Sequence, residues 1–359
     1  MLDPRATETD PPTAAPAAAT SPAPAGPTWR RLLARTLRLV EGRPFKLGFM
    51  LLLVVLGVLA VVDEWTDFKS GLDRLGPMAA FEALLCVLVG LWLNFEVWRG
   101  LLAAAGSKLP VSAGCRIYFI GQLGKYMPGS VFPVLTQMEI GRTYNVPRQR
   151  SATVAMLSMM IGLTSGLLAT VVGLPFMAGG EGRAYWWLFL LIPVMLVCLH
   201  PRVLNPVIER GLRMIRKPPP ESPLTGRTIA RAMAVNLVAW FFNGLQIWVL
   251  ATRLGAHGGH TLLAAIGAYA LAWCLGFVIV FLPAGSGIRE VILVATLGPM
   301  VVGGQAPAYA IALVSRLVTI LGDLVGAGVA GLLGLRAPRP APLAEEPRGA
   351  EVGAGVDTA

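Results

Sequence analysis

The sequence predicts an all-α polytopic membrane protein with about six full spans and two further helical segments that proline and glycine interrupt. Hydrophobic residues make up 55% of the 359 residues and charged residues only 14%, whereas a soluble globular domain carries roughly 25% charged residues. The mean hydropathy is +0.65. The formal net charge is +10, and its basic residues flank apolar stretches, which favours a membrane surface over a nucleic-acid partner.

Six apolar stretches have about the length that a helix needs to cross the membrane. A hydrocarbon core of about 30 Å takes roughly 20 apolar residues. The expected spans are residues 46–62, 78–98, 151–178, 184–199, 229–252 and 308–335. The flanking segments 1–28 and 337–359 are rich in Pro and Ala and are expected to be disordered tails. They enclose a transmembrane domain at 29–336, with half A at about 46–178 and half B at about 184–335.

Two apolar regions, 111–143 and 262–302, are each broken by proline and glycine. The expected hinges are Pro128 and Gly129 in the first region and Pro283, Gly285 and Gly287 in the second. Each region could form a re-entrant hairpin or a pair of short spans.

Basic residues determine the expected orientation. Arginine and lysine precede the first span, fill the loop 200–228 and follow the last span, so both termini are expected on the cytoplasmic side of the cell membrane. The same rule puts both ends of the first broken region inside and both ends of the second outside. The two halves then share one order of elements in opposite orientations. This pattern indicates an inverted-topology repeat, in which paired broken segments mark the substrate site.

Charged residues within the broken regions are the candidate site. A charge at the bilayer centre costs about 2.5–3.5 kcal/mol on insertion scales, and irregular backbone at depth needs a protein-lined or wet cavity. We therefore expect a cation-rich cavity that suits an anion such as phosphate. The candidate ligands are Lys125, Arg142, Arg289, Glu290 and Arg316.

Simpler interpretations remain open for these charges. Lys125, Arg142 and Arg289 could snorkel to the surface, and Arg316 could pair through water with Asp323, two helical turns further on. The amides of Asn94, Asn236 and Asn243 could join helices or line the cavity.

Two motifs resemble a known family. The stretch GQLGKYMPGSVFPV, followed by Arg142 and a Val-Pro-Arg turn, and the stretch FLPAGSGIRE are similar to signatures of the transmembrane region of the lysylphosphatidylglycerol synthase/flippase family. The resemblance covers roughly 30–335 and departs from the pattern at Met127 and Ser286. It implies a helical membrane domain that moves lipids between leaflets, and it adds Tyr126 to the expected substrate-binding residues. We expect no aminoacyl transfer, because only a tail follows residue 336.

The function expected from the residues and the resemblance is translocation of anionic phospholipids or polyprenyl-linked lipids, with the phosphate held by cations at the two breaks. The sequence contains no P-loop pattern, and we expect no cofactor and no metal. Candidates for proton coupling are Glu82, Glu96, Glu139, Glu290 and Asp323. One alternative is a glycosyltransferase-like membrane enzyme that uses Asp63-Glu64. Another is an accessory subunit that docks a partner enzyme at the loop 200–228.

Overall fold

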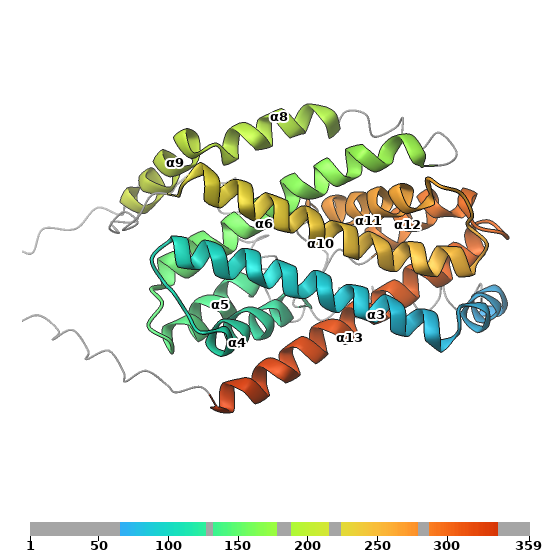
Figure 1. Ribbon diagram of the computed structural model, residues 1–359, viewed down its shortest axis with the longest axis horizontal. Coiled ribbons are helices and arrows are strands. Elements are labelled where there is room, and N and C mark those ends of the chain that lie inside the picture. Colours follow the sequence, from blue (N-terminus) through green and yellow to red (C-terminus); the bar gives the residue numbers. More distant parts are fainter. Residues whose placement is uncertain (1–64, 127–131, 178–187, 215–223, 279–286, 337–359) are drawn as a thin grey trace, which may run out of the picture. The chain divides into compact units, whose positions relative to one another are not determined.

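The structure is a computed structural model that describes residues 65–126, 132–177, 188–214, 224–278 and 287–336. Within these ranges every regular element is a helix (Figure 1). The α-helices are α3 (Trp65–Ala104), α4 (Val111–Gln122), α5 (Phe132–Arg142), α6 (Arg148–Gly173), α8 (Leu188–Leu199), α9 (Pro201–Met214), α10 (Gly226–Arg253), α11 (Thr261–Val278), α12 (Ile288–Leu297) and α13 (Gln305–Arg336). Short 3-10 helices follow three of them, namely η1 (Leu123–Tyr126), η2 (Leu174–Phe176) and η5 (Gly298–Met300).

Four helices are long and apolar enough to cross a membrane, and they confirm four of the expected spans. The spans are Asp73–Ala104, Arg148–Phe176, Gly226–Arg253 and Gln305–Leu333. The expected span 184–199 is not among these four: residues 184–187 lie outside the described residues, and Ile192–Leu199 passes the test for a span only together with Pro201–Arg210, from which it is bent by 67°. The described part of the chain therefore has four spans, or five if this bent pair is counted. The expected span 46–62 and both tails lie outside the described residues.

The predicted loop 200–228 contains a helix that the sequence did not indicate. Leu204 is a buried apolar position of α9, while Arg202, Arg210 and Arg213 are exposed. The Asn205 amide fixes α9 to the start of α10, because it donates to the Leu224 carbonyl and accepts from the Leu224 N–H, both at 3.1 Å. The helix was not predicted from the sequence because it contains prolines. Pro201, however, stands at its first position, where proline is tolerated.

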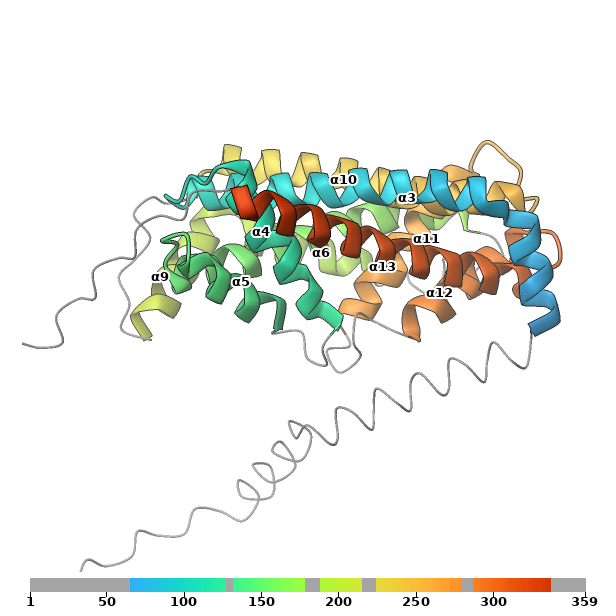
Figure 2. The same ribbon diagram turned by 90° about the horizontal axis from the view of Figure 1, so that it is seen from below.

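Each broken region folds into a helical hairpin. α4 packs against α5, and α11 packs against α12. α4 has 12 residues, α5 has 11 and α12 has 10, so at 1.5 Å per residue these arms reach only about 15–18 Å. These three arms are too short to cross a core of about 30 Å, whereas the fourth arm, α11, has 18 residues and reaches about 27 Å. Figures 1 and 2 show the α4–α5 pair toward one end of α3 and the α11–α12 pair toward the other.

The four long helices run in two opposite directions, with α3 and α13 pointing one way and α6 and α10 the other, since Gly162 and Gly166 of α6 lie against Asn236 and Trp240 of α10. α3 and α10 form an antiparallel pair, since Glu82 contacts Arg253 while Asn94 contacts Asn236. α13 runs parallel to α3, and its Gly322 lies against Val87. α6 packs on α11 and α13 packs on α4. The long helices therefore join the two hairpins.

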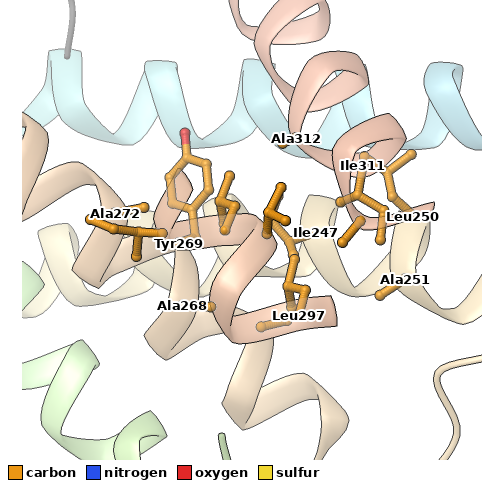
Figure 3. Close-up of a cluster of buried hydrophobic side chains, with 14 of the residues drawn as sticks. Ile247, Leu250, Ala251, Ala268, Tyr269, Ala272, Leu297, Ile311 and Ala312 are labelled. Carbon is orange, nitrogen blue, oxygen red and sulfur yellow. The ribbon is translucent and has the colours of Figure 1, made fainter. Parts of the chain in front are cut away.

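Two hydrophobic clusters hold this arrangement together. One joins α10, α11, α12 and α13 around Leu250, Tyr269 and Ile311, as Figure 3 shows. The other surrounds Phe95 and Trp98 at the opposite end of α3. Large apolar side chains also cover the outer surface, as expected for a chain that faces lipid.

Candidate functional site

A cavity of about 260 Å³ lies where the inner ends of the two hairpins meet the long helices. α3, α4, η1, α5, α6, α10, α11, α12 and α13 all contribute to its lining. Three cations line it: Lys125 from η1, Arg289 from α12 and Arg316 from α13. These residues lie far apart in the sequence, and the fold brings them to one place.

At the first hairpin the cation is already neutralised. The Lys125 Nζ lies 2.7 Å from Oδ2 of Asp323 on α13, and the Asp323 side chain is only 1% exposed. The Tyr126 hydroxyl donates a hydrogen bond to the same oxygen. A buried carboxylate is tolerated when charged and polar partners compensate for its lost hydration. This cluster therefore fixes the end of η1 to α13 as a compact ion pair.

At the second hairpin the cation has a different environment. Arg289 is buried, and its guanidinium carbon lies 4.5 Å from the centre of the Tyr269 ring on α11. Its Nη2 has no hydrogen-bond partner within the described part of the chain. The next residue, Glu290, accepts from the Gly287 N–H at 2.7 Å and lies 3.7 Å from Nη1 of Arg316.

The charges of the site do not cancel. Asp323 compensates Lys125, and Glu290 compensates Arg316. Arg289 is stacked on an aromatic ring and has no carboxylate partner among the described residues. A cation–π contact stabilises a guanidinium but does not neutralise it. Counted over the described residues, the site therefore has an excess of one positive charge, and a bound anion would balance it.

A hydrogen-bonded polar group lies on the other side of the cavity. Asn236 donates to Asn94 at 2.6 Å, Ser165 donates to Asn236 at 2.6 Å, and Trp240 donates to Ser165 at 3.1 Å. Asn94, Asn236 and Trp240 also line the cavity. Asn94 and Asn236 therefore do both, because they join α3 to α10 and line the cavity, whereas Asn243 lines the cavity and makes no hydrogen bond among the described residues.

Arg142 does not belong to this cavity. Its side chain is 58% exposed and lies 3.8 Å from Glu139, which also pairs with Arg148. The segment 121–144 is thus polar for two reasons, since its first part reaches the cavity and its end lies at the surface. Arg142 is not among the residues that line the cavity, so the expectation that it acts with the other cations is corrected.

The candidates for proton coupling separate by environment. Glu82 pairs with Arg253, Glu96 with Arg99 and Glu139 with Arg148, and all three carboxylates are partly or fully exposed. Asp323 is buried beside the cavity. Arg316 lies 3.7 Å from Glu290, and Asp323 pairs directly with Lys125; the water-mediated link between Arg316 and Asp323 stays a prediction.

Some expected features cannot be placed. Pro128, Gly129, Pro283 and Gly285 lie outside the described residues, as does the Asp63-Glu64 pair of the enzyme alternative. Gly287 is described and has a φ of +89°, which favours glycine at the start of α12. No group of three or more His, Cys, Asp or Glu side chains that could hold a metal ion occurs among the residues described.

Sequence reasoning missed Tyr269. It lies in the apolar helix α11, and nothing in the sequence marks an aromatic residue of that kind as the support of Arg289. Gln137 also lines the cavity, and its side chain is buried, with 3% exposed. Its only signal is its position in the polar stretch that includes Lys125.

The comparison with family models agrees with the motifs. The model described as "Lysylphosphatidylglycerol synthase TM region" matches residues 47–326. The chain belongs to this family. Membership supports a membrane domain that acts in lipid metabolism or transport. The comparison with curated proteins gave no match.

Proposed function

We propose that this protein translocates anionic lipids or lipid-linked molecules between the two leaflets of the cell membrane. The observation that carries the proposal is the cavity at the meeting point of the two hairpins, with its unbalanced Arg289. A phosphate offers several oxygen acceptors, and arginine binds it through parallel N–H donors. A cation inside the membrane domain that has no carboxylate partner would attract the phosphate of a lipid that crosses the bilayer.

An inverted repeat would explain how two hairpins reach one cavity. We pair α3 with α10, the α4–α5 hairpin with the α11–α12 hairpin, and α6 with α13. Under this pairing the contact of α6 with α11 corresponds to the contact of α13 with α4, and both contacts are present. Each pair of corresponding long helices also runs in opposite directions, as an inverted repeat requires.

The ion pairs suggest how the cavity could open alternately to the two sides. α13 is bound to the first hairpin through Asp323 and to the second through Arg316. We propose that movement of one repeat against the other breaks one of these links at a time. A proton on Asp323 would weaken its attraction to Lys125, which makes Asp323 the residue we propose for coupling.

We propose that the end of the bundle with α9 faces the cytoplasm. Arg202, Arg210 and Arg213 are exposed on α9, and the α3 end with Arg99 lies in the same part of the structure, because Leu204 of α9 and Trp98 of α3 belong to one cluster. A concentration of basic residues marks the inside face. The partner we propose at this face is the anionic lipid surface itself.

The experiment is a lipid-flipping assay in proteoliposomes. Fluorescent phospholipids and a polyprenyl phosphate would be followed by loss of protection of the inner leaflet, for wild type, Lys125→Ala and Arg289→Ala. We expect faster loss of protection for an anionic lipid with wild type, and loss of that activity with Arg289→Ala. Equal rates in wild type, variants and empty liposomes would contradict the proposal.

A further inference from the structure

Beyond the cations proposed to bind phosphate, the cavity is lined by amide and aromatic side chains. These side chains indicate which lipid headgroup would fit beside the phosphate. Asn94, Gln122, Asn236 and Asn243 contribute amides. The Asn94 oxygen accepts from Asn236 at 2.6 Å. The Asn94 NH₂ group donates no hydrogen bond among the described residues and is available to a ligand.

Asn243 is held close to α3 by a glycine. A Cβ on Gly90 would lie 3.0 Å from the Asn243 Oδ1 and 3.1 Å from its Nδ2. The absence of a side chain at position 90 thus leaves the space that the Asn243 amide occupies at the cavity. An amide offers both a donor and an acceptor, and a hydroxyl group can match either.

Aromatic faces complete this side of the cavity. Trp273 stacks on Phe277 with ring centres 5.2 Å apart and meets Trp240 edge to face at 5.3 Å, and all three line the cavity. Aromatic surfaces next to hydrogen-bonding amides suit a ligand that has both apolar C–H faces and hydroxyl groups. Glycerol, inositol and sugars have this character.

The same lining disfavours a cationic headgroup. Within the described residues no carboxylate lines the cavity, and the two carboxylates beside it already pair with Lys125 and Arg316. A lysyl or ethanolamine group would meet the uncompensated Arg289 and find no carboxylate among the described lining residues, which costs energy at low dielectric. The volume of about 260 Å³ lies just below the roughly 300–1,000 Å³ of small-molecule pockets, so it fits a headgroup but not acyl chains.

We propose that the cavity selects a monoanionic phosphodiester that carries an uncharged, hydroxyl-rich headgroup, with Arg289 at the phosphate and Asn94 and Asn243 at the hydroxyls. This inference rests on the proposed function and specifies its substrate class. A glycerophospholipid, a polyprenyl phosphosugar and a water-soluble glycerophosphodiester all contain this chemistry, and the test separates them.

The test measures binding separately from transport. The full-length protein in detergent would be titrated with phosphatidylglycerol, phosphatidylinositol, phosphatidylserine, phosphatidylcholine and lysylphosphatidylglycerol of the same acyl chains, and affinity would be taken from native mass spectrometry and thermal shift. A polyprenyl phosphohexose and deacylated glycerophosphoglycerol form two further arms. Phosphatidylserine is the decisive comparison, because it has the same net charge as phosphatidylglycerol but an amino-acid headgroup.

We expect phosphatidylglycerol or phosphatidylinositol to bind about tenfold tighter than phosphatidylserine, since buried amides that recognise hydroxyls discriminate against ligands that leave them unpaired. Asn94→Leu and Asn243→Leu should reduce that preference to about threefold or less, while Arg289→Gln should weaken all anionic lipids alike. Arg74→Gln, which removes an exposed cation of α3 that does not line the cavity, is the control and should change neither.

Each other outcome contradicts a stated part of the inference. Equal binding of phosphatidylglycerol and phosphatidylserine, with both weakened by Arg289→Gln, would overturn the headgroup inference and leave the phosphate site intact. Tight binding of lysylphosphatidylglycerol or phosphatidylcholine would also overturn it. Binding of the soluble diester as tightly as the lipid would identify a soluble substrate. The expected preference without any flipping in proteoliposomes would instead contradict the proposed function.

Discussion

The two hairpins have similar architecture and opposite electrostatics. At the end of η1, Lys125 is matched at 2.7 Å by the buried Asp323. At the start of α12, Arg289 is supported by the Tyr269 ring and has an unpaired nitrogen. The first hairpin is therefore joined to α13 by a direct ion pair, in which Oδ1 of Asp323 has no hydrogen-bond partner among the described residues, whereas the second hairpin presents a cation with no carboxylate partner there. The difference indicates that the anion binds at the second hairpin and that the first mainly controls movement.

The largest expected effect on stability comes from breaking the ion pair between Lys125 and Asp323. Lys125→Met leaves the Asp323 carboxylate buried with only the Tyr126 hydroxyl as a partner, and loss of one member of a buried pair costs on the order of 3 kcal/mol. Thermal unfolding in detergent should show a clearly lowered midpoint. The double variant Lys125→Met with Asp323→Asn should recover most of the loss, because no uncompensated charge then remains. A double variant as unstable as the single would show that the pair is not what holds η1 to α13.

A second prediction compares how tightly each hairpin packs on the opposite half. A Cβ on Gly173 of α6 would lie 2.5 Å from the Gly267 Cα of α11 and 2.6 Å from a backbone oxygen. A Cβ on Gly326 of α13 would instead meet the Phe119 side chain of α4 at 2.8 Å, and a side chain can turn away. Gly173→Ala should therefore destabilise by about 1–3 kcal/mol.

Gly326→Ala should cost less than Gly173→Ala in the same unfolding measurement. Gly331→Ala is the matched control, because nothing lies within 4 Å of its added Cβ. Equal losses of stability for Gly173→Ala and Gly326→Ala would contradict this prediction. They would mean that the backbone contact between α6 and α11 adjusts as easily as the side-chain contact between α13 and α4.

A smaller effect is expected at the start of α12. Glu290 accepts from the Gly287 N–H and so satisfies one donor at the helix N-terminus. Glu290→Ala should cost about 1 kcal/mol, the usual value of a lost cap. Glu290→Gln keeps an acceptor and should cost less, so the two variants compared by thermal unfolding separate the cap from the charge. A larger loss with Gln than with Ala would show that the cap is not the stabilising contact.

The sequence predicted the long spans well and the side-chain pairing poorly. A continuous apolar stretch, such as residues 229–252, directly indicates a membrane helix. Four of the expected spans were predicted correctly for this reason. The helix α9 was read as a loop, because proline and arginine interrupt its apolar pattern. A water-mediated link from Asp323 to Arg316, seven residues away in the same helix, was one open interpretation of the sequence, and the packing of α13 against η1 gives Asp323 a direct partner in Lys125.

The candidate site was predictable only in part. Charges within apolar segments are costly, and that rule singled out Lys125, Arg289 and Arg316, which the fold brings to one cavity. The same rule also selected Arg142, which lies at the surface, because depth in the membrane cannot be read from a short polar stretch. Tyr269 carries no charge and gave no signal.

The most direct test of the central claim compares the affinity for phosphatidylglycerol of two variants in detergent. One is Arg289→Gln, and the other is the double variant Lys125→Gln with Asp323→Asn, which removes a cation together with its counter-ion. If Arg289 carries the unbalanced charge, Arg289→Gln should lose about tenfold or more, equivalent to at least about 1.4 kcal/mol, while the double variant keeps nearly wild-type affinity. Unchanged binding by Arg289→Gln, with binding lost in the double variant, would contradict the claim and place the anion at the first hairpin.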